Sequence, residues 1–152
     1  MNNNKFKSIF NKIAIKNNSF IYKYGGWFFE SKNGIVLLDL QKSNYSNSYF
    51  LNIKIYINGV FDNLYDIEKK LIKDTGNIFR REPLEFKSVF DLDSNLSESE
   101  RKNELEKLFN NFIYPITEIS KEIKSILEYA KTDEIYILPA VKEELLKLAK
   151  SY

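Results

Sequence analysis

Two stretches near the middle of the chain alternate between faces and predict paired strands. From Tyr49 to Ile57 every second residue is a tyrosine, leucine or isoleucine, which predicts a half-buried strand. The preceding run, from Gly34 to Gln41, alternates less cleanly, because its second face is also partly apolar. If residues 43–48 form the loop, Leu40 lies opposite Leu51 and the apolar faces of both strands coincide.

Further strands and a helix are predicted before this pair. The spacing of Phe6, Phe10 and Ile13 predicts an amphipathic helix over residues 5–16. Two glycine-containing pairs, Gly25-Gly26 and Asn33-Gly34, are typical of hairpin turns. Counting through these turns places Trp27 opposite Tyr24 and opposite Leu40. We therefore expect four strands to share one apolar face, formed by Tyr22, Tyr24, Trp27, Phe29, Leu38, Leu40, Leu51 and Ile53.

The second half of the chain is predicted to be mainly helical. A short helix is expected to begin near Asp62, and the alternation in residues 86–92 predicts a fifth strand. Ser97 and Glu100 form a capping box at the start of a helix, which we expect to end or kink at Pro115. A further helix is predicted to about Ala130 and a last one from Pro139, after a short run (134–138) that is either a strand or an extended linker.

This order of elements predicts the fold class. Strands followed by helices favour α+β: an antiparallel β-meander of four to five strands with an N-terminal helix and a C-terminal group of helices packed on the sheet. A length of 152 residues with 43% hydrophobic residues is typical of one domain, covering residues 1–152.

The composition narrows the possible chemistry. The chain contains neither cysteine nor histidine, which removes disulfides, thiolate metal sites and the commonest general base. No window approaches the roughly 18 apolar residues of a membrane span, and the N-terminus has no continuous apolar run, so a cytoplasmic protein is expected. We expect no cofactor.

Charge is distributed unevenly along the chain. Residues 1–59 carry eight lysines against two acidic residues, whereas residues 60–152 carry fifteen basic against nineteen acidic residues. One interpretation is a basic patch for an acidic partner or nucleic acid. Because the lysines do not cluster in the sequence, we favour either attraction between the two halves in the folded protein or lysines scattered over the surface, and we do not expect nucleic-acid binding.

The second face of the predicted sheet is the best candidate for a binding surface. It mixes apolar anchors with polar side chains, as protein-binding surfaces do. The alternative is that the first or the last helix covers this face. The candidate partner-binding residues are Phe28, Leu37, Asn52, Lys54 and Tyr56.

A second hypothesis uses carboxylates. Asp39, Asp91 and Asp93 supply the oxygen ligands that a divalent cation prefers, and Arg80 or Arg81 supplies a phosphate contact. This constellation requires the third and fifth strands to lie close together. In a meander they are separated by the fourth strand, so we expect solvated acids and arginines that point in opposite directions.

The order of the pieces also resembles a known bacterial family, a domain of unknown function numbered 4304. The similarity rests on the region of Trp27, the stretch 40–56, the sequence FDLD at 90–93 and a helix ending in proline, FIYPI at 112–116. The resemblance implies no established activity and no catalytic residues. It is compatible with an immunity-like or accessory role for a small bacterial domain.

We therefore arrive at two functional hypotheses. The first is a non-enzymatic protein-binding domain that uses the mixed face of the sheet or one end of the sheet. The alternative is a carboxylate- and lysine-based enzyme or small-ligand binder, for example a divalent-metal phosphoesterase.

Overall fold

A five-stranded antiparallel sheet forms the centre of the protein, in the order β1-β2-β3-β4-β5. The structure is a computed structural model that describes residues 1–132 and 134–151. The meander predicted from the sequence is confirmed. The strands are β1 (Ile21–Lys23), β2 (Gly26–Ser31), β3 (Gly34–Lys42), β4 (Tyr49–Ile57) and β5 (Ile78–Arg81).

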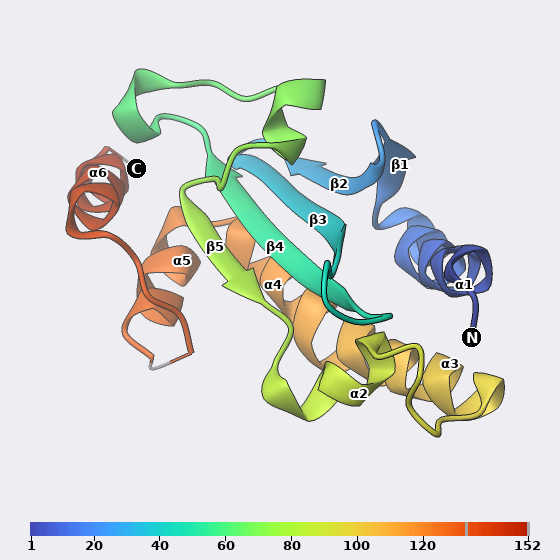
Figure 1. Cartoon of the computed structure of the whole chain (residues 1–152). Helices are drawn as coiled ribbons and strands as arrows, with labels where there is room; N and C mark the ends of the chain where they lie inside the picture. The colour runs from blue at the N-terminus through green and yellow to red at the C-terminus, as the bar shows by residue number, and fades with distance from the viewer. Residues whose placement is uncertain (133, 152) are drawn as a thin grey trace.

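Helices pack against one face of this sheet (Figure 1). They bury Leu38, Leu51 and Ile53, as predicted, in one core that also includes the aromatic side chains of the first helix. The helices are α1 (Asn3–Ile15), α2 (Lys87–Phe90), α3 (Glu98–Leu108), α4 (Tyr114–Ser120), α5 (Ile123–Ala130) and α6 (Pro139–Lys150). We call this the inner face of the sheet.

The central hairpin has the predicted register. Leu40 pairs with Leu51 and Asp39 with Asn52. Gly34 is required at the start of β3, because a Cβ there would overlap the carbonyl oxygen of Tyr56. Alternation and loop length were therefore sufficient to define this pair of strands.

The first two hairpin registers differ from the prediction by two residues. Tyr22 pairs with Trp27, and Trp27 pairs with Leu38, whereas we expected Trp27 opposite Tyr24 and Leu40. The first turn is centred on Tyr24 and Gly25, which both have positive φ, as a two-residue hairpin turn requires. An even shift keeps each strand residue on its predicted face, but Tyr24 moves into the turn.

The fifth strand was predicted in the wrong segment. It is β5, which pairs with β4, while residues 84–90 form a 3₁₀ turn and the short helix α2. Phe86, Val89 and Phe90 are buried together, which is the i, i+3, i+4 spacing of a helix rather than the alternation of a strand. Asp91, after this helix, forms an isolated bridge with Ser48.

The helical region follows the predicted order with changes in detail. The Ser97 hydroxyl accepts a hydrogen bond from the Glu100 amide, as expected for the capping box. The chain remains helical through Pro115, because residues Phe109–Ile113 form a π-helical turn that leads into α4. The helix predicted to continue to Ala130 is interrupted between α4 and α5, and residues 134–138 form neither a strand nor a helix.

Candidate functional site

The predicted partner-binding face lies beneath residues 58–77, which we call the cover segment (Figure 1). The prediction that this face is exposed and free to bind a partner is therefore wrong. Neither the first nor the last helix covers it. The five candidate side chains are almost inaccessible to solvent, with exposed fractions of 1% for Phe28, 0% for Leu37, 5% for Asn52, 4% for Lys54 and 2% for Tyr56.

The cover segment has little regular structure. Where a helix was expected near Asp62, it contains two 3₁₀ turns, Val60–Asp62 and Lys69–Ile72. Its apolar side chain Leu71 is 1% exposed and joins a small cluster with Phe28, Leu37 and Tyr56. This cluster is separate from the core on the inner face.

Two polar side chains of β4 fasten the cover to the sheet. The Tyr56 hydroxyl donates a hydrogen bond of 2.7 Å to the carbonyl of Leu71. The Lys54 ammonium donates one of 2.6 Å to the carbonyl of Ile72 and lies 3.8 Å from a carboxylate oxygen of Asp39. These bonds satisfy carbonyl groups that no helix or strand pairs.

Two asparagines complete the attachment. Asn77 accepts a hydrogen bond from the Ile57 amide at 2.7 Å, and Asn58 accepts one from the Tyr65 amide at 2.8 Å. The first bond ties the end of the segment to the end of β4, and the second holds the segment together internally. A conformation defined by specific hydrogen bonds rather than by periodicity leaves little trace in a hydrophobic pattern.

The buried ammonium of Lys54 has an altered titration. Burial lowers the pKa of Lys54, and the nearby carboxylates of Asp39 and Asp74 act in the opposite direction. The Lys54 ammonium is held by the Ile72 carbonyl and the Asp39 carboxylate, and it helps to attach the cover segment to the sheet.

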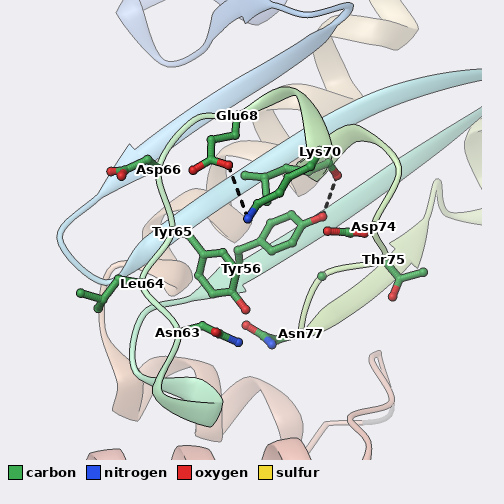
Figure 2. A pocket seen from close by; sticks show the side chains of 12 residues that line it. Tyr56, Asn63, Leu64, Tyr65, Asp66, Glu68, Lys70, Asp74, Thr75 and Asn77 are labelled. Atoms are coloured by element: carbon green, nitrogen blue, oxygen red, sulfur yellow. Dashed lines mark hydrogen bonds and ion pairs between the residues drawn. The ribbon is translucent and has the colours of Figure 1, made fainter.

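A concave pocket opens within the cover segment, beside Tyr56 (Figure 2). Its volume is about 390 Å³. The rings of Tyr56 and Tyr65 lie side by side in its wall, with centroids 5.1 Å apart. Among the five predicted residues, only Tyr56 lines this pocket.

Carboxylates outnumber ammonium groups around the pocket. Asp66, Glu68 and Asp74 line it together with one lysine, Lys70, which lies 3.5 Å from Glu68. Burial raises the pKa of Tyr56, and Asp74 raises it further, so this hydroxyl stays protonated and keeps its bond to the cover. The site therefore combines negative charge with aromatic rings.

The carboxylates of the second hypothesis are not brought together. Asp39 faces Lys54 on the sheet, whereas Asp93 accepts a hydrogen bond from Asn47 in the loop between β3 and β4. Within residues 1–132 and 134–151, no three acidic side chains form a group that suits a metal ion. The constellation proposed for a metal-dependent phosphoesterase is absent from this described part of the chain.

The two adjacent arginines point in opposite directions, as predicted. Arg80 donates hydrogen bonds to the Tyr129 hydroxyl and to a backbone carbonyl, and lies over the ring of Phe112. Arg81 donates to Asn52 and lies over the ring of Phe50. They do not form a shared phosphate clamp.

Comparison with known proteins supports the family resemblance. A family model described as "Domain of unknown function (DUF4304)" matches residues 13–119, which is more than half of the chain. The chain belongs to this family. The DUF4304 match runs from the last turn of α1 through the whole sheet and the cover segment to α4. Searches of curated proteins and of solved structures found no match.

No helix in the described part of this DUF4304 chain has the length and apolar character needed to cross a membrane.

The sequence analysis did not predict the pocket, because the residues that line it come from the least regular segment of the sequence. One signal was present: the second face of β3 and β4 carries Ile35, Leu37 and Tyr56, too apolar for a solvent-facing side.

Proposed function

We propose that the protein is a non-enzymatic binding protein of an immunity-like or accessory kind, and that its pocket receives a basic side chain from a protein partner. The observation that supports this proposal is the excess of carboxylates around a concave site whose lining includes the partly exposed ring of Tyr65, packed on the buried ring of Tyr56. Carboxylates and aromatic faces both attract an ammonium or guanidinium group.

Unpaired charge supports a cationic ligand. Glu68 is opposite Lys70, but Asp66 and Asp74 form no ion pair among the described residues. Both are exposed, so an incoming cation does not have to displace an existing partner. A hydrogen bond to a charged group contributes about 1.5–3 kcal/mol, less where solvent screens it.

The rim of the pocket supports a protein rather than a free small molecule. Leu64 lines the pocket with 83% of its surface exposed, and Phe61 nearby in the sequence is 51% exposed. Apolar anchors beside a polar pocket are typical of protein interfaces. The cover segment thus takes over the partner-binding role that the buried face was predicted to have.

The charge requirement can be tested with a matched pair of small probes. We expect N-acetyl-arginine methylamide to shift the amide NMR signals of residues 63–77, and its neutral analogue N-acetyl-citrulline methylamide to leave them in place. Asp74→Asn should weaken binding of the arginine probe about fivefold, because it removes an unpaired carboxylate from the pocket. Glu143→Gln, on the exposed side of α6, is the control.

Equal shifts with both probes would remove the charge argument. A second measurement tests whether the ligand is part of a protein. We expect a host protein to be cross-linked to the wild type and to Glu143→Gln, but not to Leu64→Ala or Asp74→Asn. Binding of the arginine probe with no such partner would instead assign the pocket to a small cation.

A further inference from the structure

A second hollow is lined by residues of α1 and α3. These two helices lie at some distance from the cover segment (Figure 1). The hollow has a volume of about 400 Å³. Four lysines line it, two of them on α1, one directly after α1 and one on α3: Lys5, Lys12, Lys16 and Lys102. We call it the lysine groove.

The helical period explains how the two lysines of α1 come together. Lys5 and Lys12 are seven residues apart, which places them on one side of α1, and Lys16 follows four residues later at the end of the helix. The opposite side carries Phe6 and Phe10, both fully buried in the core. The fold thus gathers lysines that show no cluster in the sequence.

The charge of the groove is only partly neutralised. Glu98 and Glu106 also line it, and Glu98 lies 3.1 Å from Lys5. The other three lysines form no ion pair among the described residues. The first acidic residue of the chain is Glu30, so α1 contributes no negative charge of its own.

We infer that the lysine groove docks an acidic segment of a protein partner. Ile9 and Ile13 line the same hollow and provide an apolar surface for one side chain of that segment. Lys12, Lys16 and Lys102 are placed to pair with its carboxylates. This inference concerns a different surface from the pocket and does not depend on the proposed function.

Two other polyanions fit the groove less well. A membrane surface requires an apolar helix face that can enter the lipid, and the apolar face of α1 is buried in the core. A nucleic-acid backbone carries continuous negative charge, which Glu98 and Glu106 would oppose within the groove. A peptide can place its carboxylates beside the lysines and its apolar side chain beside the isoleucines.

The test uses a short fluorescein-labelled peptide of glutamates with two leucines, and a control peptide with glutamine in place of glutamate. We expect fluorescence anisotropy to show binding of the acidic peptide alone, weakened by added salt. The double variant Lys12→Glu, Lys16→Glu should weaken it about tenfold, since it reverses two charges at exposed positions. Lys142→Glu, Lys150→Glu makes the same net change on exposed sites of α6.

The outcomes separate the alternatives. Equal weakening by both double variants would show that only net charge matters and would overturn the assignment to the groove. Tighter binding of single-stranded RNA or of phosphatidylserine vesicles than of the peptide would assign the groove to another class of partner. Asp74→Asn should leave peptide binding unchanged, which keeps this result distinct from that of the pocket.

Discussion

The two faces of the sheet are buried by different means. On the inner face, helices with regular apolar spacing cover Leu38, Leu51 and Ile53. On the other face, an irregular segment covers Phe28 and Leu37 through one small cluster and a few hydrogen bonds. The comparison shows that burial alone does not require periodic structure, provided that polar side chains satisfy the backbone of the covering segment.

The largest loss of stability is expected for a substitution in the core of the inner face. Leu51→Asp buries a carboxylate where the wild-type leucine is fully inaccessible, so we expect loss of the folded state. Such a burial costs several kcal/mol, against a total stability of about 5–15 kcal/mol. Retention of the wild-type thermal transition, followed by circular dichroism, would mean that the inner face is wrongly assigned.

A matched pair of leucines compares the two faces directly. Leu105→Ala in α3 should reduce the free energy of unfolding by about 3–5 kcal/mol, and Leu71→Ala in the cover by about 2 kcal/mol, because the cover can adjust around the smaller residue. Hydrogen exchange should become faster throughout the protein in the first variant. In the Leu71→Ala variant, hydrogen exchange should become faster mainly in residues 58–77. If exchange instead became faster throughout the protein in this variant too, both faces would unfold as one unit.

The hydroxyl of Tyr56 provides a smaller and pH-dependent test. Tyr56→Phe removes its bond to Leu71 and should cost about 1 kcal/mol at neutral pH. The folded-state pKa of Tyr56 is raised above its ordinary value of 10.0, so its contribution is fully present below pH 10.0 and lost as the pH rises above it. Stability should therefore decline less steeply above pH 10.0 in Tyr56→Phe than in the wild type, as measured by urea unfolding.

The smallest effect is expected where α6 meets the cover segment. Glu144 accepts a hydrogen bond of 2.7 Å from the Phe61 amide, and this bond lowers the pKa of Glu144. Glu144→Ala should speed hydrogen exchange at Phe61, whereas its exposed neighbour Glu143→Ala should not. In the wild type the protection should be present above the ordinary pKa of 4.5 and fade at lower pH, as the carboxylate becomes protonated.

The candidate sites were less predictable than the strands for physical reasons. The pocket depends on the cover segment, where φ is positive at Phe61 and Asp62 and short 3₁₀ turns replace a helix. The apolar residues of such an irregular segment have no regular spacing that would predict its structure. The lysine groove depends on a contact between α1 and α3, which are far apart in the sequence. Each helix alone shows only ordinary solvent-facing lysines.

The sequence by itself determined the hairpin from β3 to β4, the capping box at Ser97 and the α+β order of elements, because alternation and capping act between residues close along the chain. Tertiary structure decided what covers each face. It also buried Arg101, whose guanidinium donates hydrogen bonds to the carbonyls of Val89 and Asp91. Such partners are selected by the packing of distant segments, and no local pattern records them.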